Sequence, residues 1–190
     1  TFYSQKDLKK LDKFMEGKPV AEQEIGRQLL HETEAYAESS VCRRRLLLHY
    51  FGEIYPNPNC EMCDNCLHPK EQIEASKQLL IVLQAVKTLG EKFTQEYIIN
   101  FVSGNASEDI KDHLHHQLDD FGVGEKEDSK IWAPVIRHAL LAGFLRKDVE
   151  SYGQLKLTAA GKRYIKNPTK FMIVLNAEFN EQDEEDEIIG

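Results

Sequence analysis

The stretch Cys60-Glu61-Met62-Cys63-Asp64-Asn65-Cys66 spaces three cysteines at two-residue intervals, and 17 residues separate it from a fourth cysteine, Cys42. A two-residue gap allows a tight turn to aim both of its sulfurs at one centre, and the repeated gap brings three thiolates together. Four thiolates close a tetrahedral shell around zinc and leave no open position for water. The spacing therefore predicts one structural zinc ion bound by Cys42, Cys60, Cys63 and Cys66.

Three other states of the cysteines compete with a zinc site. Disulfides are disfavoured because the N-terminus lacks the features of a secretory signal, and cytosolic thiols stay reduced. An iron–sulfur cluster is the main rival, because ferredoxins also combine Cys-x2-Cys-x2-Cys with a remote cysteine. In ferredoxins the run continues with a further cysteine and a proline, whereas Leu67-His68-Pro69 follows Cys66 here. Unpaired thiols are the third alternative.

The residues around the cysteines suit a segment that a metal holds together. Three prolines bracket the cluster: Pro56, Pro58 and Pro69. A proline-rich segment this short cannot build its own apolar core, so a cross-link such as a bound metal ion is needed to hold it together. We expect Arg43, Arg44 or Arg45 to offset the negative charge of a zinc–thiolate centre and one of them to pair with Asp64, because such outer contacts hold metal ligands in place. The alternative is that these arginines are ordinary surface residues.

The apolar spacing along the chain predicts helices first and a hairpin last. Residues 1–50 carry apolar side chains at helical intervals, interrupted at Gly17-Lys18-Pro19, which predicts a long helix or a bent helical hairpin. The elements expected after the cysteines are helices at 72–89, 94–103, 110–121 and 129–143, strands at 144–147 and 154–157, a helix capped by Thr158, and a strand at 171–175. This order indicates a mainly α chain with a small β component: a helical zinc-binding module over 1–70, then a winged-helix domain over 71–177.

Charge is distributed unevenly along the chain, whose formal net charge is −8. Residues 178–190 hold seven acids and no lysine or arginine, which predicts a disordered acidic tail. Residues 105–128 carry eight acids and two bases, whereas residues 129–170 carry nine bases and two acids. So basic a segment either attracts phosphate backbones or forms a solvated lysine-rich face, and charge alone does not choose between the two.

Several motifs taken together resemble the RecQ-type DNA helicases of bacteria. Cys42-Arg43-Arg44, Tyr50-Phe51-Gly52-Glu53 and the Cys60–Cys66 stretch are similar to the zinc-binding module of that family. The motifs similar to its C-terminal winged-helix (RQC) domain are Ser103-Gly104-Asn105, Phe121-Gly122-Val123-Gly124, Ser129-x2-Trp132-x3-Ile136-Arg137 and Leu157-Thr158-x2-Gly161. The resemblance covers residues 1 to about 175, and Phe2-Tyr3 makes residues 1–5 similar to the end of the second motor lobe.

The resemblance implies the DNA-binding, structural part of an ATP-dependent 3′–5′ DNA helicase that acts in DNA repair and recombination. The chain begins without Met and contains no Gly-x4-Gly-Lys-Ser/Thr loop, so we expect a fragment whose ATP and Mg²⁺ belong to motor domains outside it. The implied partners are duplex DNA and single/double-strand junctions, with a single-strand-binding protein as a further contact, and the implied location is the cytoplasm, at the nucleoid. Because no apolar run approaches the roughly 18 residues that span a bilayer, no membrane partner is expected.

Six residues of the winged-helix segment are candidate DNA contacts: Ser129, Lys130, Arg137, Lys147, Tyr152 and Lys156. Ser129 is expected to cap the Trp132 helix, whose first amides would hold a phosphate with the help of Lys130. Lys147 and Lys156 lie on the expected hairpin, and Arg137 either reaches a phosphate or pairs with the acidic segment before it. Tyr152, at the hairpin tip, either stacks on a terminal base pair as a wedge, as in some relatives, or is a solvated turn residue. Trp132 is expected to pack in the core.

Two functions of other classes stay open at this stage. A winged-helix transcription regulator would bind one DNA sequence through its recognition helix. A protein-interaction adaptor would turn the basic face to an acidic partner and bind no forked DNA. A helicase part should instead bind forked DNA by its structure, whatever the sequence.

Overall fold

The structure is a computed structural model that describes residues 5–148, 151 and 153–176. These residues divide into two compact units: the first holds residues 5–69 together with Asn176, and the second lies within Lys70–Leu175. The acidic tail predicted at 178–190, and all but the last residue of the motor-lobe remnant predicted at 1–5, lie outside the described residues.

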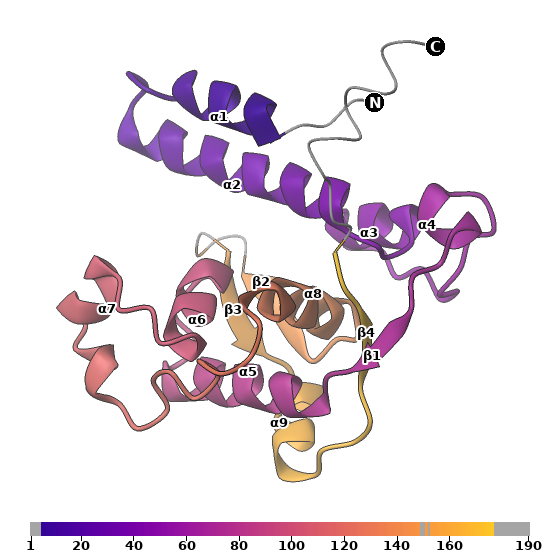
Figure 1. Cartoon of the computed structure of the whole chain (residues 1–190). Helices are drawn as coiled ribbons and strands as arrows, with labels where there is room; N and C mark the ends of the chain where they lie inside the picture. Colours follow the sequence, from indigo (N-terminus) through magenta and orange to yellow (C-terminus); the bar gives the residue numbers. More distant parts are fainter. Residues whose placement is uncertain (1–4, 149–150, 152, 177–190) are drawn as a thin grey trace. The chain divides into compact units, whose positions relative to one another are not determined.

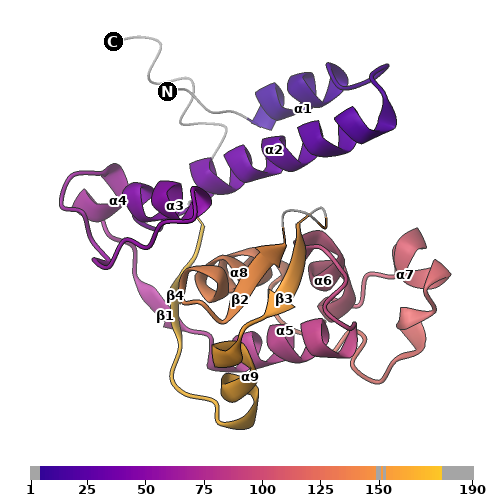
Figure 2. The same ribbon diagram turned by 180° about the vertical axis from the view of Figure 1, so that it is seen from behind.

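The first unit is helical, whereas the second combines helices with two small sheets (Figures 1 and 2). The helices of the first unit are α1 (Gln5–Lys13), α2 (Val20–Glu38), α3 (Arg43–Tyr50) and α4 (Asp64–Leu67). The helices of the second unit are α5 (Ser76–Thr88), α6 (Gln95–Val102), α7 (Glu108–Asp112), α8 (Trp132–Leu141) and α9 (Ala159–Lys166), with short 3-10 turns η1 (His115–Gln117) and η2 (Ser129–Ile131). The strands are β1 (Gln72–Glu74), β2 (Leu145–Asp148), β3 (Gln154–Leu157) and β4 (Met172–Val174).

The helical hairpin of the first unit has very little apolar core. Helices α1 and α2 lie side by side (Figure 1), and Arg27 Nε donates to Asp12 Oδ1 across them at 3.1 Å. Among the residues whose side chains the structure describes, the only buried apolar ones in this unit are Val41 and Cys42. Because burial of apolar surface is the main source of folding free energy, this unit needs another source of stability.

The second unit is a winged-helix domain with a continuous core. Helices α5, α6 and α8 pack on one another, and α5 also contacts β3 and α9. The largest fully buried side chains come from α5, α6, α8 and β3 among other elements, and include Leu79, Phe101, Trp132, Ile136 and Leu155. The predicted packing of Trp132 in the core is therefore confirmed, and so is the fold class.

Two antiparallel strand pairs complete the second unit. Strands β2 and β3 form the wing hairpin, in which Leu145 pairs with Leu157 and Asp148 pairs with Gln154. Strand β1 pairs with β4, so that Ile73 lies opposite Ile173 (Figure 2). The prediction of a helix from residue 72 is wrong at its start, because Gln72–Glu74 pair with a strand about a hundred residues later and α5 begins only at Ser76.

The glycine motifs of the second unit lie where two segments cross. Gly122 N–H donates to Phe101 O at 2.9 Å and Gly124 N–H to Val102 O at 2.8 Å, which joins the segment 121–124 to the end of α6. Both Gly104 and Gly122 have positive φ, and a Cβ on either one would lie 3.3 Å from the Cα of the other. Only glycine allows this backbone crossing without strain.

Two further predictions of local structure differ from what is observed. The helix expected over 110–121 is a short α7 that Ser107 caps, followed by the turn η1, because Leu114 adopts a left-handed φ of 58° that ends the helix. The first hairpin strand lies one residue later than expected, at Leu145–Asp148. Thr158 does cap the last helix, since its side chain accepts from Gly161 N–H.

Within the described part of the chain, no helix combines the length and the apolarity needed to cross a bilayer.

Candidate metal centre and nucleic-acid interface

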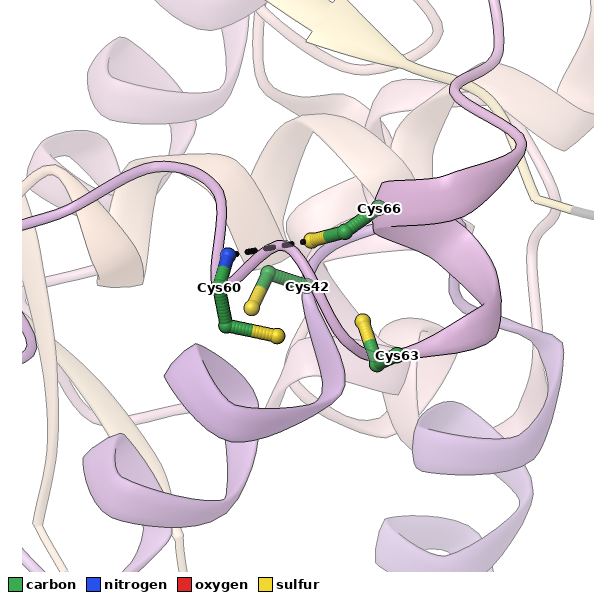
Figure 3. A group of neighbouring side chains, drawn as sticks. All are labelled: Cys42, Cys60, Cys63 and Cys66. Carbon is green, nitrogen blue, oxygen red and sulfur yellow. Dashed lines mark hydrogen bonds between the residues drawn. The ribbon is translucent and has the colours of Figure 1, made fainter.

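The four cysteines meet in one cluster in the first unit. Cys42 immediately precedes α3, Cys63 immediately precedes α4, Cys66 lies within α4, and Cys60 comes from the loop before it. Their four Sγ atoms lie within 4.8 Å of one another, and Figure 3 shows the sulfurs turned toward one another. The turn that carries Cys60, Cys63 and Cys66 and the distant Cys42 before α3 thus contribute to the same cluster.

The dimensions of the cluster fit a zinc ion. A tetrahedral centre with Zn–S bonds of about 2.3 Å places its sulfurs about 3.8 Å apart. The sulfur separations of up to 4.8 Å need only a small contraction to reach this value. In addition, Cys60 N–H donates to Cys66 Sγ at 3.3 Å (Figure 3), a contact that stabilises a thiolate. The donor set and its geometry therefore suit a closed, four-thiolate site.

The thiols of the cluster differ in acidity. Hydrogen bonds from the backbone amides of Met62 and Cys63 lower the pKa of the Cys60 thiol to about 6, whereas burial raises the pKa of the Cys66 thiol to about 12. Four thiolates this close repel one another, so a cation must replace their protons for all four to ionise. Metal binding would release protons, and metal affinity would fall as the pH is lowered.

Arg43 links the cysteine loop to the end of α2. Its Nη2 donates to Asp64 Oδ2 at 2.9 Å and its Nε to Asp64 Oδ1 at 3.1 Å, so the expected arginine–Asp64 pair is present. Its Nη1 donates to the carbonyls of Tyr36 and Ala37 in the last turn of α2, where a cation also complements the helix dipole. The Arg43 guanidinium holds the pKa of Asp64 below its usual value. A single side chain thus connects α2, the start of α3 and the turn that carries Cys63.

Arg44 has different surroundings from its neighbour. Its guanidinium lies over the Tyr55 ring, 5.9 Å from the ring centroid, and the hydrogen bond with Tyr55 raises its pKa. Its charge also interacts with Cys60 and Cys42. Arg44 therefore acts on the thiols through electrostatics and fixes the proline-rich loop through Tyr55.

Asn65 is a positioning residue that the sequence did not single out. Its Nδ2 donates to Ser39 O at 2.7 Å and to Val41 O at 2.8 Å. These two bonds join the Cys63–Cys66 turn to the segment that leads into Cys42. The cysteine spacing contained no signal for them, because their partners lie 24 and 26 residues away.

The start of α8 differs from the predicted phosphate site. Asp128, and not Ser129, caps this segment, since Asp128 Oδ1 accepts from Lys130 N–H at 2.9 Å. The prediction that Ser129 caps the Trp132 helix is wrong, because the turn η2 comes first and places Ser129 inside it. A carboxylate at this position also repels a phosphate. Lys130 is exposed beside it.

The other candidate DNA contacts lie on α8 and on the wing. Arg137 is half-buried on α8, and Tyr152 lies outside the described residues. On the wing, Lys147 pairs with the buried Leu155, so it shares the face of the hairpin that turns to the core. Lys156 pairs with Arg146 on the opposite, open face of the wing. Arg146 is exposed there and was not among the candidate DNA contacts, although the alternation of side chains along the strands would have placed it beside Lys156.

Lys156 has partners within the second unit. Its Nζ donates to the carbonyl oxygen of Glu91 at 2.5 Å and to Gln154 Oε1 at 3.0 Å. These bonds hold its charge against the turn that joins α5 and α6. Lys156 therefore fixes the wing, in addition to any contact with DNA.

Comparison with known proteins adds two family matches. A family model described as "RecQ zinc-binding" matches residues 5–67, and one described as "RQC domain" matches residues 69–182. The cysteine cluster lies within the first match and the winged-helix core within the second.

Individual relatives include bacterial and animal proteins. The chain is 33% identical over 163 residues to the ATP-dependent DNA helicase RecQ of Pasteurella multocida (strain Pm70), which covers 85% of this chain and 26% of that protein. It is 31% identical over 167 residues to the ATP-dependent DNA helicase RecQ of Haemophilus influenzae, covering 87% of this chain and 27% of that protein. It is 27% identical over 180 residues to the mouse bifunctional 3′–5′ exonuclease/ATP-dependent helicase WRN, a match that covers 80% of this chain and 13% of that protein. The chain thus spans about a quarter of the length of these bacterial relatives.

Proposed function

Since the chain belongs to the RecQ family of DNA helicases, of which it contains the zinc-binding module and the RQC winged-helix domain, we propose that it is the DNA-binding, structural part of an ATP-dependent DNA helicase. The observation that carries this proposal is the presence of both modules, in the family's order, in one chain. ATP and Mg²⁺ would bind in motor domains beyond this segment, and 3′–5′ unwinding in DNA repair and recombination would be the work of the whole enzyme, in the cytoplasm at the nucleoid.

In this proposal Cys42, Cys60, Cys63 and Cys66 hold a structural zinc ion. The ion would cross-link the loop before α4 to the segment before α3 and leave no ligand position for a substrate. Arg43 and Asn65 hold the same two segments together from outside the cluster. The sparse apolar core of this unit supports the assignment, because such a unit depends on its metal for stability.

The composition of α8 supports DNA binding by structure and not by sequence. Apart from Arg137 and His138, the helix consists of apolar residues. His138 Nε2 accepts from Val174 N–H at 3.2 Å, and its ring packs edge-on against Phe171, so His138 serves the core. Direct readout of base edges needs several polar side chains along a recognition helix, and α8 does not supply them. This argues against a transcription regulator that reads an operator through α8.

The basic residues before and after α8 are the proposed contacts to duplex phosphates near a junction. We expect the triple change Lys130→Gln, Arg146→Gln and Lys147→Gln to weaken binding to a forked duplex at least tenfold. The slope of log affinity against log salt concentration should become shallower by about two to three, because each lost phosphate contact releases about 0.9 fewer counterions. Fluorescence anisotropy at several salt concentrations measures both quantities.

A matched control separates these contacts from net charge. The triple change Lys87→Gln, Lys111→Gln and Lys126→Gln removes the same charge from exposed positions elsewhere in the second unit. It should leave the affinity within about threefold of the unchanged protein. If both triple variants lose affinity for the forked duplex equally, the assignment of these residues as DNA contacts is wrong. Preferential binding of one duplex sequence over random competitor DNA would instead favour a transcription regulator.

Contact with a single-strand-binding protein is a further part of the proposal. It is supported by a surface hollow of the second unit with an apolar floor of Phe144, Ala160 and Tyr164 and a basic rim of Arg163 and Lys166. A basic rim over an apolar floor suits an acidic segment that also carries apolar side chains. We expect Arg163→Glu with Lys166→Glu to weaken binding of a single-strand-binding protein at least tenfold in calorimetry, whereas Lys87→Glu with Lys111→Glu should not. If both charge reversals leave the affinity equal, the hollow is not the contact.

A further inference from the structure

The open face of the wing places two cations directly opposite each other. Arg146 and Lys156 are cross-strand partners, so their side chains emerge on the same face of the hairpin. Like charges in this position repel each other and weaken the strand pair. The next pair on the same face is Asp148 and Gln154, where the Asp148 carboxylate accepts from the Ser151 hydroxyl at 3.1 Å. The arrangement at Arg146 and Lys156 is one that an anion would stabilise.

Glu91 lies at the free edge of β3 and makes two contacts with that strand and one with α9. Its carbonyl accepts from Lys156 Nζ, its Oε2 accepts from Leu157 N–H at 2.9 Å, and its Oε1 lies 3.3 Å from Lys162 Nζ. The neighbouring Phe93 carbonyl accepts from Leu155 N–H at 2.9 Å, so the segment 91–93 runs along the free edge of β3. A left-handed turn, with φ of 70° at Gly90 and 59° at Glu91, brings the glutamate to this position.

The two carboxylate oxygens of Glu91 have separable roles. The bond from Leu157 N–H satisfies a backbone amide on the edge of β3 and is structural. The ion pair with Lys162 is largely exposed, since the lysine side chain is 59% accessible and the glutamate 28%, so it contributes little to stability. It does, however, neutralise a cation at the edge of β3, where the Glu91 carbonyl also holds Lys156.

We propose that Glu91 competes with DNA phosphates for Lys162 beside the open face of the wing, and so weakens the binding of DNA by this surface. The inference rests on the proposed DNA-binding function of the second unit. A phosphate that approaches the open face meets Lys162 already paired with Glu91, and Lys162 binds the phosphate only after it leaves Glu91. Loss of the carboxylate should therefore strengthen binding.

The test is the isosteric change Glu91→Gln, which keeps an oxygen acceptor for Leu157 N–H and removes the charge. We expect forked duplex DNA to bind about fivefold more tightly at low salt, the effect of one charge pair at short range. The slope of log affinity against log salt should steepen by about 0.9, so that affinity falls about 3.5-fold further between 50 and 200 mM salt. Fluorescence anisotropy across this range measures both.

Four further variants test whether the gain in affinity comes from the release of Lys162. Glu96→Gln removes an equal charge from an exposed position on α6 and should change affinity less than twofold. Lys162→Gln should have little effect alone but should abolish the gain when combined with Glu91→Gln. The proposal is overturned if Glu91→Gln and Glu96→Gln behave alike, if the gain survives without Lys162, or if Lys162→Gln alone weakens binding as much as Arg146→Gln. The last comparison decides the matter even where Glu91→Gln does not fold. If the unchanged protein binds no forked DNA, the proposed function fails instead.

Discussion

Replacement of Cys60 by serine is expected to unfold the first unit of the protein while the second unit still melts as a winged helix. The first unit buries only two apolar residues among those whose side chains the structure describes, so we expect its stability to come from the metal. Structural zinc contributes on the order of 10–16 kcal/mol in small zinc-dependent domains, more than the whole stability of a typical domain. The expected result is loss of the bound zinc, measured by elemental analysis, together with rapid proteolysis within residues 5–69.

A graded series makes this prediction sharper. Met62→Ser places the same residue at an exposed position of the same loop and should keep one zinc per chain and normal protease resistance. Asn65→Ala leaves all four ligands in place but removes the two bonds to Ser39 and Val41, so zinc affinity should fall about 10- to 100-fold in competition with a chelator. Retention of zinc and of protease resistance by Cys60→Ser would contradict the structural role. Iron with visible absorption in place of zinc would identify an iron–sulfur cluster.

A methyl group added at Gly161 is expected to destabilise the second unit by at least about 2 kcal/mol. A Cβ at this position would lie 2.2 Å from the Phe144 carbonyl oxygen, far inside van der Waals contact. That carbonyl also accepts from Thr158 N–H at 3.1 Å, so the backbone that would have to move anchors the start of α9. Alanine favours a helix over glycine by only about 0.5–1 kcal/mol, and overpacking typically costs about 1–3 kcal/mol, more where backbone atoms clash. The steric cost of the added methyl group should therefore exceed the gain in helix propensity.

Gly143 provides the contrast for this prediction. Its φ is 72°, so alanine is strained there, but nothing lies within 4 Å of the position that a Cβ would take. We expect Gly143→Ala to cost about 1 kcal/mol and Gly161→Ala to cost more, although Gly161 lies in an ordinary helix. Thermal or urea melts of the second unit measure both changes. A Gly161→Ala protein as stable as the unchanged one would show that α9 shifts freely against Phe144, contrary to the close approach described.

The positions of the basic residues affect how a helicase part of this kind would hold DNA. In the proposed function, cations on the wing and before α8 would contact phosphates, whereas α8 itself supplies few groups for base recognition. Binding would then depend on salt and on DNA structure more than on sequence. This is the behaviour that an unwinding enzyme needs at successive positions along a duplex.

The sequence by itself was sufficient for features that depend on short-range spacing. The Cys-x2-Cys-x2-Cys stretch predicted that its three sulfurs meet, because a turn of this length can aim them at one centre, and the structure brings them together with Cys42. The order of helices and hairpin indicated the winged helix, and the isolated Trp132 among apolar residues indicated a core position, because periodicity encodes which face is buried. Thr158 was recognisable as a helix cap because its acceptor partner lies three residues away.

Only the tertiary structure decided the features whose partners lie far apart in the chain. Strand β1 exists because it pairs with β4 about a hundred residues later, and Asn65 matters because it reaches carbonyls 24 and 26 residues upstream. The sequence placed Lys156 on a hairpin as a candidate DNA contact, whereas the fold brings the Glu91 carbonyl, 65 residues away, to its ammonium group. A local pattern shows what a segment can form, whereas packing decides which distant polar groups satisfy one another. The cysteine cluster was therefore evident from the sequence, and the residues that position the cluster and the wing were not.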